Sequence, residues 1–316
     1  MENAENIRED QDAADLSGSY HVPVLLQEAI EALNIRPSGV YVDCTFGGGG
    51  HSKEILKHLN GDGKLIVFDQ DEAAKKNVPS DKRIIFVAQN FRHLQKFLRL
   101  HKHPRVDGIL ADLGVSSYQF DEAARGFSTR FDAALDMRMD NRQPLTAADI
   151  LNNHTELQLH KIFEKFGEVT NSKTLAKTIV EQRTISPFKS INAFKQSVQG
   201  IVKGNPNKYF AQVFQALRIA VNDEMGALEE MLQQAVAALK PGGRLVVISF
   251  HSLEDRMVKN FIKHGAVQEP EADDVYGTRP ESPLTTISKK PIGASAAELK
   301  INPRSRSAKL RIAQKN

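Results

Sequence analysis

Four consecutive glycines, Gly47 to Gly50, stand between an apolar run that ends at Asp43 and a helical stretch that begins at Ser52. A backbone without side chains can turn sharply and lie close to a ligand. Asp69 ends the next apolar run about 20 residues further on, where an acid can accept hydrogen bonds from both ribose hydroxyls of an adenosine group. The loop and Asp69 together predict an adenosine-containing cofactor beyond the carboxyl ends of the strands.

Two classes of cofactor fit this pattern. Dinucleotide enzymes use the spacing G-x-G-x-x-G to hold a pyrophosphate at a helix N-terminus, whereas the glycines here are contiguous. Asp43 would repel a pyrophosphate but suits the cationic amino end of S-adenosylmethionine. We therefore favour S-adenosylmethionine over a nicotinamide dinucleotide. Phe91 follows the third apolar run and either packs on the adenine or belongs to the core.

A second group of polar and aromatic residues follows the fourth and fifth apolar runs. Asp112 ends the fourth run and is followed by two serines. Its carboxylate, the backbone carbonyls or the serine hydroxyls can accept hydrogen bonds from an amine that is to be methylated. The motifs D-P-P-Y and N-P-P-Y of amino methyltransferases are absent. Phe250 and His251 follow the fifth run. Phe250 can stack on a base, while His251 either takes the surplus proton or caps the next helix.

Residues 135–140 (LDMRMD) mix apolar and charged side chains in an irregular stretch. Asp136 and Arg138 either contact the substrate or form a structural ion pair. Asp136 and His251 are the candidates for catalysis, and the catalytic base stays undecided. No group of His, Cys, Asp and Glu residues has the spacing of metal ligands, so we expect no metal. The single cysteine, Cys44, excludes an internal disulfide and favours a reducing, cytoplasmic location.

Charge is distributed unevenly along the chain, whose net charge is +3. Residues 1–16 hold six acids and one base, whereas residues 289–316 hold eight bases and one acid. The basic segment is either a solvated tail or a surface for a polyphosphate partner. We expect no signal peptide and no membrane span, since no apolar run approaches the roughly 20 residues that a span needs. The sequence does not distinguish a monomer from a homodimer.

Short apolar runs alternate with helical stretches in the first part of the chain. Near-continuous apolar runs are typical of strands covered on both faces, and their alternation with helices implies right-handed crossovers. We therefore predict an α/β fold with a doubly wound, mostly parallel sheet, like that of the class I (Rossmann-like) methyltransferases. Residues 307–312 alternate in polarity and predict a final antiparallel strand at the sheet edge. The five predicted parallel strands are residues 40–43, 65–69, 84–87, 106–112 and 245–249.

About 130 residues separate the fourth and fifth strands, too many for a loop in a compact domain. Apolar stripes at helical spacing predict that residues 126–222 form an all-helical insert docked on the sheet domain. The last of its helices is expected to run unbroken past Met231 to Leu239, back into the core. Residues 20–125 and 223–316 then form the cofactor-binding methyltransferase domain, and residues 1–19 form a disordered acidic arm.

Ten segments together resemble one family, RsmH (MraW), in the same order from about residue 20 to the C-terminus. The segments at 135–140 (LDMRMD) and 249–256 (SFHSLEDR) are highly specific. The others are residues 21–26 (HVPVLL), 45–51 (TFGGGGH), 107–110 (DGIL), 112–117 (DLGVSS), 125–128 (RGFS), 214–219 (FQALRI), 221–224 (VNDE) and 302–307 (NPRSRS).

The resemblance implies an enzyme that methylates N4 of a cytosine in the decoding centre of 16S ribosomal RNA, within the small ribosomal subunit. It also implies that the insert helps to present the RNA. Two segments depart from the family pattern: Ala134 replaces a common proline, and residues 204–212 replace the common H-P-A-x-R-T. The resemblance implies cofactor contacts at Gly49, Gly50, His51, Asp69, Phe91, Asp112 and Gln119.

Two other functions stay open at this point. A methyltransferase could act on another substrate, such as DNA cytosine, a protein or a small molecule. A non-catalytic RNA-binding module could retain a vestigial cofactor fold. The intact loop of residues 47–50 with Asp69 and Asp112 argues against loss of the cofactor site.

Overall fold

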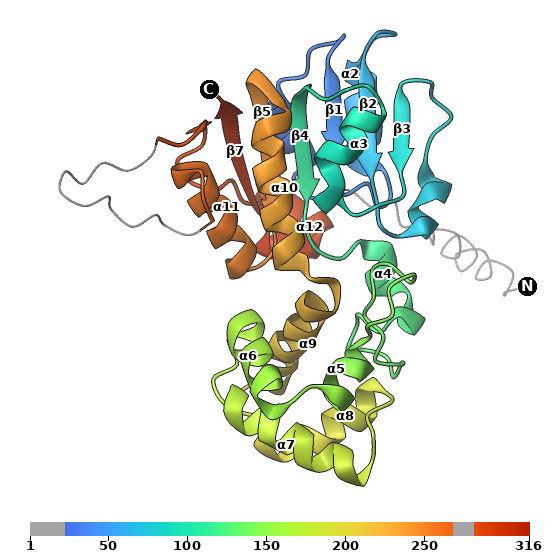
Figure 1. Ribbon diagram of the computed structural model, residues 1–316, viewed down its shortest axis with the longest axis vertical. Helices are drawn as coiled ribbons and strands as arrows, with labels where there is room; N and C mark the ends of the chain where they lie inside the picture. Colours follow the sequence, from blue (N-terminus) through green and yellow to red (C-terminus); the bar gives the residue numbers. More distant parts are fainter. Residues whose placement is uncertain (1–22, 268–280) are drawn as a thin grey trace, which may run out of the picture.

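The computed structural model describes residues 23–267 and 281–316, so the predicted acidic arm of residues 1–19 lies outside the described part. A seven-stranded sheet in the order β3-β2-β1-β4-β5-β7-β6 forms the upper part of the molecule in Figure 1. β3, β2, β1, β4 and β5 run parallel, as predicted, and β7 pairs antiparallel with both β5 and β6. The strands are β1 Val40–Asp43, β2 Lys64–Phe68, β3 Ile84–Val87, β4 Val106–Asp112, β5 Leu239–Ser249, β6 Leu284–Thr286 and β7 Lys309–Lys315.

The prediction for the last strand was right about its direction and wrong about its place. β7 is antiparallel, but β6 pairs with its outer side and forms the edge of the sheet. β6 has three residues, of which Leu284 alone is buried, so it lacks the apolar pattern by which the longer strands were found. β5 also begins six residues earlier than predicted, at Leu239.

Helices cover both faces of the sheet. On one face, α3 (Leu94–Leu100), α10 (Glu224–Ala238) and α11 (Ser252–His264) bury their apolar sides against the strands. On the other face, α1 (Leu26–Leu33) and α2 (Gly50–His58) do the same. Strands buried on both faces explain why the parallel strands are apolar almost throughout.

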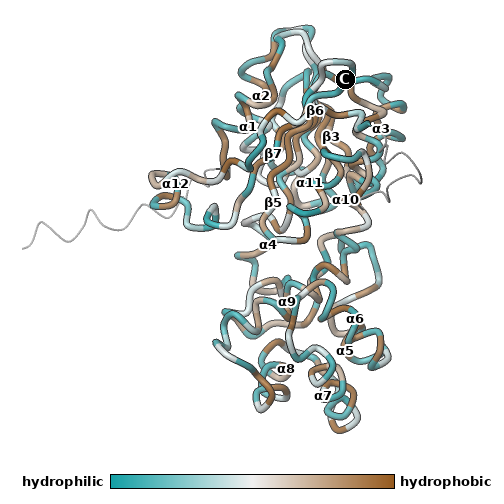
Figure 2. Tube along the Cα trace, turned by 90° about the vertical axis from the view of Figure 1, so that its left-hand side faces the viewer, coloured by the Kyte–Doolittle hydropathy of each residue, from teal (hydrophilic) through white to brown (hydrophobic). Residues whose placement is uncertain are grey.

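Five helices form a separate lobe, which lies below the sheet in Figure 1 and is enclosed around its own apolar core. Figure 2 shows the same lobe from the side, joined to the sheet near α4 (Ser117–Asp121) and α9. Phe163, Phe194 and Phe214 are among the residues buried in this core. The helices of the lobe are α5 Ala147–Asn153, α6 Glu156–Gly167, α7 Ser172–Ile185, α8 Ile191–Val198 and α9 Pro206–Asn222.

The chain returns from the lobe to the sheet through a break that the sequence did not predict. α9 ends at Asn222 and α10 begins at Glu224, because Asp223 adopts a left-handed conformation with φ of 47°. Asp tolerates this conformation better than most residues. Asp223 also pairs with Arg92 at 2.6 Å. The prediction of one unbroken helix to Leu239 was therefore wrong.

Within the described residues, no helix is both long enough and apolar enough to span a lipid bilayer.

Candidate active site

The glycine loop connects β1 to α2 at the carboxyl edge of the sheet. Gly47 and Gly49 have φ of +51° and +76°, the left-handed region that side chains disfavour. At Gly50 the constraint is space, since an added Cβ would lie 2.1 Å from Cγ of Pro23. An added Cβ at Gly48 would meet no atom within 4 Å, so the loop has an open side for a ligand.

Asp69 follows β2 directly and faces this loop. Its Oδ2 accepts a hydrogen bond from the backbone N–H of Gly47 at 2.8 Å, and its Oδ1 accepts one from that of Asp71 at 2.8 Å. Each carboxylate oxygen keeps a second lone pair for a ligand hydroxyl. Burial raises the pKa of Asp69 to about 6, and the nearby carboxylates of Asp71 and Asp43 add to the effect.

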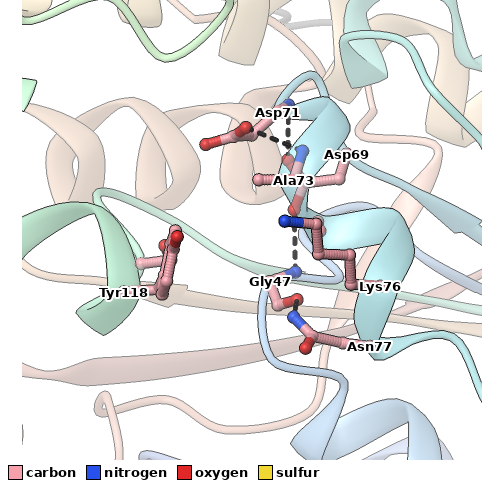
Figure 3. Close-up of a pocket in the computed structure, with 9 residues that line it drawn as sticks. Gly47, Asp69, Asp71, Ala73, Lys76, Asn77 and Tyr118 are labelled. Carbon is pink, nitrogen blue, oxygen red and sulfur yellow. Dashed lines mark hydrogen bonds between the residues drawn. The ribbon is translucent and has the colours of Figure 1, made fainter. Parts of the chain in front are cut away.

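Asp69 lines a pocket between the glycine loop, the 3-10 helix η1 (Glu72–Asn77) and α4. Figure 3 shows Tyr118 on α4 facing Asp69 and Lys76 across this space. Sequence reasoning did not single out Asp71, Lys76, Asn77 or Tyr118. The pocket is lined by Gly47, Asp69, Asp71, Ala73, Ala74, Lys76, Asn77, Ser116 and Tyr118.

Gln119 does not line the pocket itself but contacts Asp71, which does. Its Nε2 donates a hydrogen bond to Oδ2 of Asp71 at 3.0 Å, and both side chains are buried. Its Oε1 accepts a hydrogen bond from the backbone N–H of Ser116, which caps α4. Phe91 begins the 3-10 helix η2 (Phe91–His93), is partly buried and packs against the sheet core.

The ends of β1 and β4 bring further polar groups together. Asp43 is buried, and its Oδ2 accepts a hydrogen bond from the hydroxyl of Ser52 at 2.7 Å. Nε2 of His51 lies 3.0 Å from the carbonyl oxygen of Val24, and its Nδ1 lies 3.8 Å from Oδ2 of Asp112. The other oxygen of Asp112, Oδ1, is buried without a hydrogen-bond partner.

The surroundings of the Asp112 carboxyl also change its pKa. Burial raises the pKa of Asp112 well above its usual value, and the charges of Asp43 and Glu254 raise it further. A buried acceptor without a partner costs free energy unless a ligand satisfies it. The Asp112 carboxyl is therefore suited to accept a hydrogen bond from a bound N–H group.

The two candidates for catalysis are both engaged in local structure. His251 is the N-cap of α11: its Nδ1 accepts a hydrogen bond from the backbone N–H of Glu254 at 3.4 Å, and its Nε2 lies 3.2 Å from Oε1 of the same residue. Asp136 forms a bidentate pair with Arg138, at 2.8 and 2.7 Å, which lowers the pKa of Asp136 despite its partial burial. These contacts fit the structural interpretation left open for each residue.

One cluster brings together residue types that bind metals, although their sequence spacing did not predict it. Ligand atoms of Glu224, His251 and Glu254 lie within 4.8 Å of one another. Arg218 already provides a cation there, with both of its hydrogen bonds to the Glu224 carboxylate, at 2.9 and 3.0 Å. This partly buried arginine thus compensates part of the negative charge of the cluster.

Sequence comparison identifies the family of this chain and its relatives. A sequence profile described as the MraW methylase family matches residues 18–316. The chain belongs to this family. Ribosomal RNA small subunit methyltransferase H of Bacteroides thetaiotaomicron is 53% identical over 298 residues, which cover 94% of this chain and 98% of the relative. The enzyme of the same name from Flavobacterium johnsoniae is 51% identical over 297 residues, covering 94% and 98%.

Solved structures give a more distant likeness. A solved structure from Clostridium thermocellum matches with a TM-score of 0.43 at 10% identity, covering 94% of this chain and all of that one.

As an MraW methylase, the protein uses S-adenosylmethionine as its methyl donor, and the described residues fit this cofactor. The open glycine loop admits the backbone of a ligand, and Asp69 offers acceptors for two ribose hydroxyls. Asp43 and Asp112 place carboxyl groups at the ends of β1 and β4, where a bound cationic amino group would stabilise their ionised form. A dinucleotide pyrophosphate would meet repulsion at the same place.

Proposed function

We propose that this methylase transfers a methyl group to the exocyclic N4 of a cytosine in the decoding centre of 16S ribosomal RNA, in the small subunit. The names of the relatives that are 53% and 51% identical support an rRNA substrate, and each alignment spans nearly the whole of this chain and of the relative. The structural observation that carries the proposal is the unsatisfied Oδ1 of Asp112, a buried acceptor at the end of β4.

An aromatic side chain, Phe250, lies near the end of β4 that carries Asp112. An added Cβ at Gly114, just after β4, would lie 3.7 Å from the ring of Phe250, which follows β5. A base stacked on Phe250 would bring its exocyclic amine near Asp112. The lone pair of that amine is delocalised into the ring, so the enzyme must hold the nitrogen in line with the methyl group.

In this mechanism, Asp112 Oδ1 accepts a hydrogen bond from one N–H of the amine and orients its lone pair toward the methyl group. The bound cofactor supplies an electrophilic methyl at this place. After transfer the nitrogen carries a surplus proton, and the raised pKa of Asp112 allows its carboxylate to accept that proton. His251 contributes by capping α11 and so fixing Phe250, whose backbone N–H donates to Glu254 at 2.9 Å.

We further propose that the cofactor is held by the residues that the family resemblance implies. Asp69 has the most direct support, since it lines the pocket, and Gln119 is supported by its contact with Asp71. The full set comprises Gly49, Gly50, His51, Asp69, Phe91, Asp112 and Gln119.

The helical lobe and the basic C-terminal segment are proposed to bind the RNA around the target base. Arg304, on the 3-10 helix η5 (Pro303–Ser307), lies over the ring of Phe120 at 5.3 Å and pairs with Asp121 at 2.5 Å, so this segment contacts α4. Tyr118 and Phe131 are large aromatic side chains that are 59% and 49% exposed, available for stacking on bases. The cytoplasm, where small subunits are, is the corresponding location.

The test is methyl transfer from radiolabelled S-adenosylmethionine to isolated small subunits, with free cytidine and DNA as competing substrates. Subunits should be labelled, and mass spectrometry should locate the label on N4 of one cytosine. Asp112→Asn should abolish most of the labelling while leaving the fold intact. Labelling of free cytidine or DNA at an equal rate would refute the proposal.

A further inference from the structure

Arg125 connects the cofactor pocket to the loop that leads into the helical lobe. It ends the 3-10 helix η3 (Ala123–Arg125), and its side chain is 12% exposed. One terminal nitrogen, Nη1, donates to Oδ2 of Asp71 at 2.8 Å. The other, Nη2, donates to the carbonyl oxygens of Arg138 and Met139 at 2.9 and 3.1 Å. A single guanidinium thus holds two distant segments of the chain.

At the pocket, Arg125 neutralises the second of two neighbouring carboxylates. Asp71 lines the pocket, and its backbone N–H donates to Oδ1 of Asp69. The charge of Asp71 raises the pKa of Asp69, the residue proposed to bind the ribose. Without a cation on Asp71, the uncompensated charge of its carboxylate would raise the pKa of Asp69 further, and Asp69 would be protonated at a higher pH.

At the other end, Arg125 holds a strained piece of backbone. Met137 has φ of +60°, a conformation that is costly for a residue other than glycine and persists only when its surroundings enforce it. Its backbone N–H donates to the carbonyl oxygen of Arg125 at 3.1 Å. On the far side, the Asn222 amide donates to the Met137 carbonyl at 2.8 Å and accepts from the Met139 N–H at 2.7 Å.

Asn222 is the last residue of α9 and precedes the break at Asp223. The contacts therefore form a continuous path from Asp69 through Asp71 and Arg125 to residues 137–139, and on to the point where the lobe joins the sheet. Figure 1 shows this region between α4 and the junction of α9 with α10.

We propose that Arg125 is a positioning residue that fixes Asp71 at the cofactor pocket and residues 137–139 at the end of α9, and so couples cofactor binding to RNA binding. Arg125 is not among the residues that line the pocket. The RNA half of this inference rests on the proposed rRNA substrate, and the cofactor half rests on the proposed contact of Asp69 with the ribose.

The cofactor half is tested by calorimetry with S-adenosylhomocysteine from pH 5 to pH 8. Arg125→Gln removes the charge, so the pH at which affinity is half-maximal should rise by about one to two units above the wild-type value, and affinity at pH 6.5 should fall about 3- to 25-fold. Arg125→Lys keeps the charge and should keep the wild-type midpoint. An unchanged midpoint in Arg125→Gln would overturn this half.

A double variant separates charge from folding. In Asp71→Asn/Arg125→Gln neither charge remains, so the midpoint should return toward that of the wild type. If the pH of half-maximal affinity stayed as high as in Arg125→Gln, the charge of Asp71 would not be the cause of the shift. This variant and Arg125→Lys also keep the test available if Arg125→Gln alone does not fold, which thermal unfolding would reveal.

The RNA half is tested by the KM for small subunits at saturating S-adenosylmethionine. The ammonium of Arg125→Lys cannot span Asp71 and both carbonyl oxygens, so its KM should rise several-fold although its pH midpoint is unchanged. An unchanged KM in both Arg125 variants, with an active wild type, would refute the coupling. An inactive wild type would instead refute the proposed function and leave the calorimetric result standing.

Arg142 provides a matched control. It also joins the loop to η1, through Asp140 at 2.8 Å and Glu72 at 3.3 Å, but its side chain is 40% exposed. Because exposed ion pairs contribute little, Arg142→Gln should leave both the pH midpoint and the KM unchanged. Equal effects of Arg142→Gln and Arg125→Gln would show that the measurements report general loosening of the loop.

Discussion

Cofactor affinity should depend on the protonation of Asp69. Ribose hydroxyls donate hydrogen bonds to an ionised carboxylate, and burial raises the pKa of this group to about 6. At pH 7.5 nearly all of it is ionised, whereas at pH 5 about one molecule in eleven is. Affinity for S-adenosylhomocysteine should therefore fall about tenfold between these pH values, equivalent to about 1.4 kcal/mol.

Asp69→Asn identifies the residue responsible. An asparagine has one carboxamide oxygen for the two backbone N–H groups of Gly47 and Asp71, so it loses acceptor capacity for the ribose. Affinity at pH 7.5 should fall by about 1–3 kcal/mol, or about 5- to 150-fold. The variant should also lose the dependence between pH 5 and pH 7.5 that the wild type shows.

Calorimetric titrations of both proteins at several pH values provide the assay. Histidines also titrate in this range, but they are common to the two proteins, so the difference between the two pH profiles isolates Asp69. The stability of the free protein should change in the opposite direction. Since the folded pKa of Asp69 exceeds its unfolded value, its contribution favours folding most below about pH 4 and is lost as the pH rises through about 6. A flat wild-type affinity profile, or a variant that keeps the wild-type slope, would refute the assignment.

Three further substitutions test other parts of the site. Asp112→Asn should lower kcat for methyl transfer about 100-fold, measured in single turnovers, because a carboxamide is a weaker acceptor for the amine; a near-normal kcat would remove Asp112 from the mechanism. Gly50→Ala should lower the free energy of unfolding in urea by about 1–3 kcal/mol, because its Cβ meets Pro23, and an unchanged urea midpoint would contradict the clash. His251→Asn should retain the cap on the backbone N–H of Glu254, so its free energy of unfolding should change by less than about 1 kcal/mol. Its kcat should fall less than the kcat of Asp112→Asn falls. A larger fall in kcat would make His251 a proton acceptor.

The parallel sheet and the glycine loop could be predicted because both depend on local patterns. Buried parallel strands are apolar almost throughout, and four glycines followed by Asp69 mark a ligand-binding turn. β6 was missed because three residues carry no periodicity, and its place is set by pairing with β7. The role of His251 as a cap could have been recognised, since Glu254 stands three residues after it, the spacing of a capping box.

Other parts of the site depend on contacts between residues far apart in the chain. Asp71 meets Arg125 across 54 positions, and Asn222 meets Met139 across 83. Neither pair has a signal in a single sequence, because an Asp–Arg or Asn–backbone contact has no preferred spacing. The cluster of Glu224, His251 and Glu254 could not be predicted from the sequence either, since only the fold brings α10 and α11 together.

The break at Asp223 shows how such distant contacts determine local structure. Apolar spacing alone favours one helix that runs from about Phe210 to Leu239, and nothing in the side chains forbids it. The last residue of α9, Asn222, uses its amide to hold Met137 and Met139, while Asp223 pairs with Arg92. These contacts offset the cost of one left-handed residue, because each hydrogen bond contributes about 1 kcal/mol and the strain costs about the same. The chain changes direction where the lobe must be fixed to the sheet, so the break and the coupling through Arg125 are parts of one arrangement.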